Sequence, residues 1–115
     1  GNADFAGNGV YQAMLEKNVY GFGMFGDNTE KAPDQILANY ILDYGAGLVG
    51  LAAEVKAGTF KPTSNIEFGL ADEDVIYIVY NENAATPVPQ ELRDEVAALY
   101  SKISSGEIDT LAPVE

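Results

Sequence analysis

The chain has 115 residues, 47% of them hydrophobic, and its 18 acidic against 6 basic side chains give a net charge of −12. Cysteine and histidine are absent, which excludes disulfides, thiol chemistry, the commonest general base and the commonest zinc ligand. This length and apolar content predict one globular domain, and the negative charge argues against nucleic acid and anionic lipid as partners.

The first predicted elements are a short helix and a strand. The helix covers residues 9–17, with Asn8 as its N-cap and Asn18 in the left-handed conformation that ends it. The strand covers residues 19–25, where two glycines leave one face bare. A bare face allows a helix or a ligand to approach the backbone closely.

A polar loop and a long helix follow. The loop covers residues 27–34 and begins at Asp27, at the carboxyl end of the strand, where open α/β sheets bind ligands. Apolar residues at helical spacing predict one helix over residues 35–57, which ends at Gly58. Three glycines lie inside this helix, and we expect them to mark close packing or a kink.

The remaining elements are two strands and a helix. Residues 63–70 predict a strand, and residues 71–74 predict a solvated acidic turn and not a calcium loop. The unbroken β-branched and aromatic run at 74–80 favours a strand that is buried on both faces. A last helix is predicted over residues 89–105, with a buried stripe formed by Leu92, Val96, Leu99, Tyr100 and Ile103.

This order of elements predicts an α/β fold with three layers, in which helices cover both faces of a mainly parallel sheet. The first strand is missing, because residues 3–5 look like the exit of a strand that the chain does not contain. The chain also begins without an initiator methionine or a basic signal-peptide region, so we expect a processed or excised piece.

The run AGNGVYQAMLEKNVYGFGMFGDN at residues 6–28 resembles a segment of the basic membrane protein family, the substrate-binding lipoproteins of bacterial ABC importers. Four further matches follow in the family's order: Ala57-Gly58-Thr59-Phe60-Lys61, Phe68-Gly69-Leu70, Val88-Pro89 and Ser105-Gly106-Glu107-Ile108. The resemblance implies that residues 1–115 form a flavodoxin-like or periplasmic-binding-protein-like lobe, the C-terminal lobe of a two-lobed receptor.

The resemblance also implies a function. The receptor closes as a clamp on a small polar solute such as a nucleoside, delivers it to an ABC permease, and is lipid-anchored outside the cytoplasm. Asn8 and Gly9 match the turn beside the ligand cleft, and Asp27 matches the acidic residue that accepts hydrogen bonds from sugar hydroxyls. Phe5 and Tyr11, near the glycine turn, are candidates for stacking on a ring-shaped ligand.

Plainer interpretations stay open for the same residues. Asp27 is equally well explained as a solvated turn residue, and Asn8 as a simple N-cap. We expect no enzyme activity, no cofactor and no metal site, because no nucleophile has an adjacent base and no metal-binding spacing occurs. The alternative function is an assembly module that forms a homodimer through the open edge of its sheet.

Overall fold

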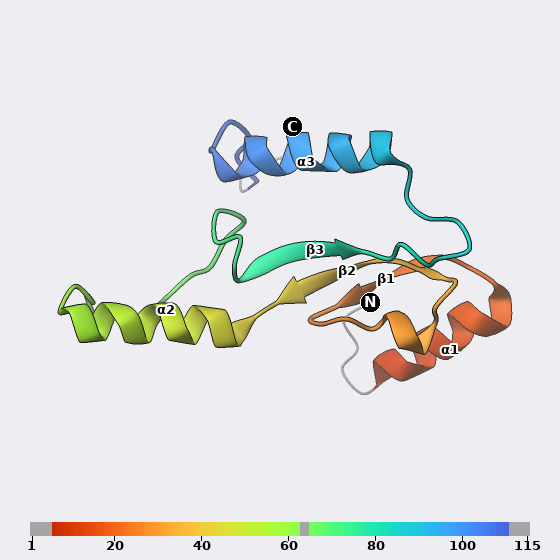
Figure 1. Ribbon diagram of the computed structural model, residues 1–115, viewed down its shortest axis with the longest axis horizontal. Helices are drawn as coiled ribbons and strands as arrows, with labels where there is room; N and C mark the ends of the chain where they lie inside the picture. Colours follow the sequence, from red (N-terminus) through yellow and green to blue (C-terminus); the bar gives the residue numbers. More distant parts are fainter. Residues whose placement is uncertain (1–5, 63–64, 111–115) are drawn as a thin grey trace.

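The computed structural model describes residues 6–62 and 65–110, which form a small α/β domain with one three-stranded sheet (Figure 1). The α/β class is therefore confirmed. In chain order the elements are α1 (Gly7–Lys17), β1 (Gly21–Met24), the 3-10 helix η2 (Thr29–Lys31), β2 (Ile36–Leu42), α2 (Tyr44–Ala57), β3 (Ile76–Tyr80) and α3 (Gln90–Ser104). None of the helices in the described ranges is long and apolar enough to cross a bilayer.

The sheet is mixed, with the strand order β1-β2-β3. β1 pairs with β2 in parallel, whereas β3 pairs with β2 antiparallel, so the expected parallel arrangement holds for one of the two pairings. Within the part of the chain that the structure describes, the outer edges of β1 and β3 have no further strand beside them. Both edges therefore present unpaired backbone groups.

The helix predicted over residues 35–57 is wrong in its first third, which forms the central strand β2. Apolar residues at positions 36, 37, 40 and 41 fit a helical spacing, but pairing with strands on both sides selects the extended form. α2 begins only after Asp43, whose Oδ1 accepts a hydrogen bond of 2.9 Å from the Ala46 N–H. Asp43 thus caps the helix that the sequence pattern extended too far.

At two helix ends, the residue type alone was enough to predict the backbone conformation. Asn18 (φ 50°) and Gly58 (φ 72°) take the predicted left-handed conformation at the ends of α1 and α2. Asn8 is not an N-cap, because α1 already begins at Gly7 after Ala6. Among the α2 glycines, Gly47 packs closely, since an added Cβ would lie 2.9 Å from Phe68 Cζ.

Two glycine substitutions at α2 should change stability in opposite directions. Gly58→Ala places a Cβ in the left-handed region and should lower the free energy of unfolding by about 1 kcal/mol. Gly50→Ala should raise it by about 0.5–1 kcal/mol, because Gly50 lies inside the helix and an added Cβ meets no atom within 4 Å. Urea denaturation of the two variants at one protein concentration measures both changes, and equal signs would contradict this account.

The strand predicted at residues 63–70 is not formed: residues 65–69 have no regular structure, and residues 63–64 lie outside the described residues. β3 is confirmed as a strand, but Ile78 is 41% exposed and Val79 is 38% exposed. The expectation that β3 is buried on both faces is therefore wrong. Among the described residues, too few elements pack against this strand to cover both of its sides.

A small buried cluster lies between α1 and the start of β2, separate from other buried apolar residues such as Ile41 and Ile76. Met14, Ala32 and Ile36 form it, and Tyr11 packs against them. α2 extends away from the sheet along the long axis, and α3 lies alongside β3 without forming a shared buried core (Figure 1). The radius of gyration is 17.1 Å, compared with about 13 Å for a compact domain of this length.

Candidate functional site

The loop after β1 is held by a polar cluster that contains Asp27. Oδ1 of Asp27 accepts hydrogen bonds from the Thr29 N–H at 2.9 Å and from Asn39 Nδ2 at 3.1 Å. Asn39 lies in the middle of β2 and is fully buried. Its Nδ2 also donates to Thr29 Oγ1 at 2.9 Å, and its Oδ1 accepts from the Asn28 N–H at 3.0 Å. Through these hydrogen bonds, Asp27 caps a turn.

The acid dependence of stability should report on this cluster. Hydrogen bonding by Thr29, first from its side chain and then from its backbone N–H, lowers the pKa of Asp27 below the ordinary value of 3.8. Because the folded pKa is the lower one, the contribution of Asp27 to stability is complete above the unfolded pKa and is lost as the pH falls through the folded pKa.

We therefore expect Asp27→Asn to be less stable than the wild type at neutral pH. The difference should shrink as the pH falls below 3.8 and through the lower pKa of the folded state, because the wild-type carboxyl becomes protonated there and loses its advantage. Urea denaturation at a series of pH values measures the two free energies of unfolding. A difference that stays constant across the acid range would show that ionisation of Asp27 plays no part.

The other predicted site residues lie on α1 or before it. Asn8 and Gly9 are exposed in the first turn of α1, and the described hydrogen bonds of Asp27 involve neither of them. Tyr11 is half-buried, and Lys31 Nζ lies 5.1 Å from the centroid of its ring. Phe5 lies outside the described residues.

Sequence reasoning missed Asn39, although a signal was present. The run Ile36–Leu42 is apolar except for this one amide, which is a reason to look for a buried hydrogen-bonding role. The acidic turn was correctly anticipated: the Asp72 carboxylate accepts a hydrogen bond of 2.7 Å from the Gly69 N–H. Over residues 6–62 and 65–110, no group of three potential metal ligands comes together.

A different feature dominates the surface, an apolar cavity of about 650 Å³ between α3 and one face of the sheet. We call it the α3 groove. Its lining includes three sheet residues and three helix residues: Phe22, Tyr40, Ile78, Leu92, Val96 and Leu99. The predicted buried stripe of α3 is thus wrong as a closed core, because Leu92, Val96 and Leu99 are 39–49% exposed.

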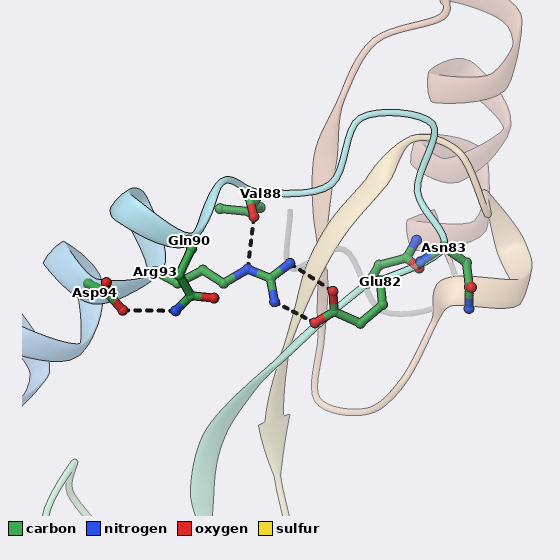
Figure 2. A network of polar contacts seen from close by, with 7 residues as sticks. Glu82, Asn83, Val88, Gln90, Arg93 and Asp94 are labelled. Carbon is green, nitrogen blue, oxygen red and sulfur yellow. Dashed lines mark hydrogen bonds and ion pairs between the residues drawn. The ribbon is translucent and has the colours of Figure 1, made fainter.

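Two tethers hold α3 beside the sheet. At its first turn, Arg93 donates from Nε to the Val88 carbonyl at 2.8 Å and forms an ion pair with Glu82 (Figure 2). The guanidinium also lies 4.6 Å from the centroid of the Tyr80 ring. Further along α3, the Tyr100 hydroxyl donates to the Ile76 carbonyl at 3.1 Å. The α3 groove is therefore preformed between fixed walls.

The electrostatics of these tethers follow from their partners. The hydrogen bond from Arg93 lowers the pKa of Glu82, and the same bond raises the pKa of Arg93. Burial raises the pKa of Tyr100, and the acidic side chains Glu73 and Asp72 raise it further. At neutral pH, Glu82 is therefore negatively charged, Arg93 is positively charged and Tyr100 is neutral.

A second uncovered apolar surface lies on α2. Four of its residues recur at intervals of four, three and four positions and form what we call the α2 stripe: Tyr44, Leu48, Leu51 and Val55. Tyr44, Leu48 and Val55 are 64%, 66% and 60% exposed. A helix that is apolar around most of its circumference is normally buried. α2 therefore has the composition of an interior helix in an exposed position.

The total accessible surface is large for the mass of the chain. The accessible surface is 8383 Å², about 2,300 Å² more than the roughly 6,100 Å² expected for a compact monomer of 12.3 kDa. Single exposed apolar side chains are ordinary, but contiguous apolar patches mark contact surfaces. The fold and these surfaces thus describe an α/β domain with two open apolar faces.

The comparisons with known proteins give a likeness in fold. No protein-family model matches the chain, and no curated protein matches it. The chain is similar to the crystal structure of a transcriptional activator of the comK gene from Bacillus halodurans, with a TM-score of 0.73 and 18% sequence identity. The likeness covers 90% of this chain and 35% of that chain, so this chain spans about a third of its length. Identity at this level shows a common fold.

These findings correct the family expected from the sequence. The similar structure is a transcriptional activator, and no family model supports membership of the basic membrane protein family. The roles of substrate-binding lipoprotein and importer component are therefore wrong for this chain. We therefore also withdraw the two partners that those roles implied, which are the nucleoside or other polar ligand and the ABC permease.

Proposed function

We propose that this chain is a non-enzymatic assembly module that forms a homodimer and thereby covers its open surfaces. The observation that carries the proposal is the excess of about 2,300 Å² of exposed surface. Obligate homodimers bury about 2,000–5,000 Å² in total over the two partners, so an excess of this size on each chain suits that class of interface.

The sheet edges support the same proposal. Among the described residues β1 and β3 are edge strands, and neither carries the charged or proline residues that usually protect an edge. We also propose that association completes the three-layer arrangement, with helices on both faces of the sheet. The chain alone provides no helix that buries either face fully.

The likeness to a transcriptional activator suggests a regulatory context for this assembly. A regulatory module acts by contact, which fits a chain that has no histidine or cysteine and no metal-ligand group among its described residues. The absence of enzyme activity is part of this proposal. An extracytoplasmic location stays a prediction.

The test is the association state of the chain in solution. Sedimentation velocity and light scattering should give a species of twice the 12.3 kDa chain mass, and dilution should lower the thermal midpoint because unfolding is coupled to dissociation. A species of one chain mass, with a sharp unfolding transition that does not depend on concentration, would overturn the proposed function. Such a result would mean that the folded monomer is stable with its apolar surfaces exposed to water.

A further inference from the structure

The two uncovered apolar surfaces differ in shape, because the α2 stripe is convex and the α3 groove is concave. We propose that they are partners across the dimer: α2 of one copy lies in the α3 groove of the second copy, and the exchange is reciprocal. The inference rests on the proposed homodimer and specifies which surfaces form it. The occupant of the groove is thus a second copy of this chain.

The two helices, α2 and α3, have similar lengths. α2 has 14 residues and α3 has 15, which corresponds to lengths of about 21 Å and 23 Å. α2 extends beyond the sheet, where a second copy can reach it (Figure 1). A helix seated beside α3 would place the α2 stripe against the apolar wall formed by Leu92, Val96 and Leu99.

The charges of the two surfaces also agree. The chain carries a net charge of −12, so association must use its least charged parts. α2 contains one acidic and one basic residue, Glu54 and Lys56, and the α3 groove contains one charged residue, Glu95. No ion pair of Glu95 appears among the described residues. Lys56 from the second copy supplies a cation for this carboxylate at the edge of a neutral contact.

Reciprocal docking differs from simpler contacts in how much of the two apolar surfaces it covers. A symmetric contact between two α2 helices would leave both grooves open, and pairing of strand edges alone would leave the grooves and α2 open. Reciprocal docking covers both surfaces with one kind of contact, which two-fold symmetry repeats and closes.

A charge exchange tests the contact directly. Leu48→Glu puts an anion on the α2 stripe, and Val96→Lys puts a cation in the α3 groove. Each variant alone should weaken dimerisation by about 100-fold or more, because an unpaired charge is buried in both copies of the contact. In an equimolar mixture the heterodimer keeps one unchanged contact and gains one Glu–Lys pair. The mixture should therefore recover dimers that neither variant forms alone.

The matched control is Leu15→Glu, which adds the same charge to α1 at a leucine that is 43% exposed. Its dimerisation should equal that of the wild type, and circular dichroism should show that all variants keep their helix content. Two outcomes would overturn the docking mode while the proposed function stands. One is wild-type dimerisation of both charge variants. The other is loss of dimers with Leu48→Glu but normal dimers with Val96→Lys, which indicates contact between two α2 helices.

Cysteine pairing gives a second measurement in a chain that contains no cysteine of its own. Leu48→Cys and Val96→Cys chains are mixed, oxidised and separated without reductant. A disulfide between the two different chains is expected, because the side chains must lie within about 4 Å at their Cβ atoms to be joined. Disulfides only between identical chains would overturn reciprocal docking. A monomeric wild type would instead overturn the proposed function itself.

Discussion

Gly23→Ala should destabilise the protein more than any other methyl-sized change in β1. An added Cβ at this position would lie 1.9 Å from Asn39 Oδ1, 2.9 Å from Asn39 Cγ and 3.2 Å from Asn28 Cβ. The first two distances are shorter than any that real Cβ atoms keep, so the neighbours must move. We expect the free energy of unfolding to fall by about 3 kcal/mol.

The size of this effect follows from what Asn39 does. Its amide is fully buried and holds the loop after β1 through Asp27, Asn28 and Thr29. The side chain cannot rotate away from a new methyl group without breaking those hydrogen bonds. A buried donor or acceptor that loses its partner costs about 1–3 kcal/mol.

Two further variants separate the clash from a general effect of alanine. Gly26→Ala is the matched control, because an added Cβ there meets no atom within 4 Å, and its stability should change by less than about 1 kcal/mol. In the double variant Gly23→Ala with Asn39→Ala the two losses should not add, since the second change removes the clashing atoms. Urea denaturation at one protein concentration measures the free energies of unfolding of the wild type, of Gly23→Ala, Asn39→Ala and Gly26→Ala, and of the double variant. Full additivity would contradict the proposed contact.

Asn81→Leu is expected to have the second large effect. Asn81 is 4% exposed, and its Nδ2 donates to the Pro33 carbonyl at 2.7 Å and to the Ile36 carbonyl at 2.8 Å. Its Oδ1 accepts from the Asn83 N–H at 3.0 Å. One side chain thereby ties the end of β3 to the start of β2.

Leucine has a similar size but neither donates nor accepts, so three backbone groups lose their partner together. We expect a loss of about 3 kcal/mol in the free energy of unfolding. Amide hydrogen exchange should also accelerate in β3, because the substitution removes the Asn81 hydrogen bonds that hold the end of β3 to β2. An unchanged exchange rate in β3 would show that the ladder with β2 is sufficient by itself.

Asn83→Leu provides the control for this prediction. Asn83 is exposed and contributes its backbone N–H to the hydrogen bond with Asn81, which the substitution retains. Its stability should change by no more than about 0.5 kcal/mol. Comparable losses in the two leucine variants would mean that hydrophobic substitution in this loop is harmful for another reason.

Local sequence signals predicted those parts of the fold that depend on local chemistry. Asn18 and Gly58 were correctly placed at helix ends, because the left-handed conformation is a property of single residues. The strand around Ile76–Tyr80 and the helix around Gln90–Ser104 were also correctly predicted from their residue types and spacing. The helix assigned to residues 36–42 was wrong, because its apolar pattern suits both a helix and a buried strand.

The site was less predictable than the fold. Asp27 was given two interpretations, a ligand residue and a turn residue, and its described hydrogen bonds are those of a capped turn. Asn39 and Asn81, which hold the sheet together, belong to no sequence motif, although Asn39 is the one amide in an apolar run. Their roles depend on partners that lie 10–12 and 45–48 positions away along the chain.

The sequence by itself determined the charge of −12, the absence of histidine and cysteine, and the apolar character of α2 and of one face of α3. It could not determine whether those apolar faces are buried, because burial depends on how many elements the folded chain can bring to each side of the sheet. Only the tertiary structure showed that, among the described residues, too few elements pack on the sheet to cover these faces. Leu48 and Val96 are therefore exposed, which is the basis for the proposed contact with a second chain.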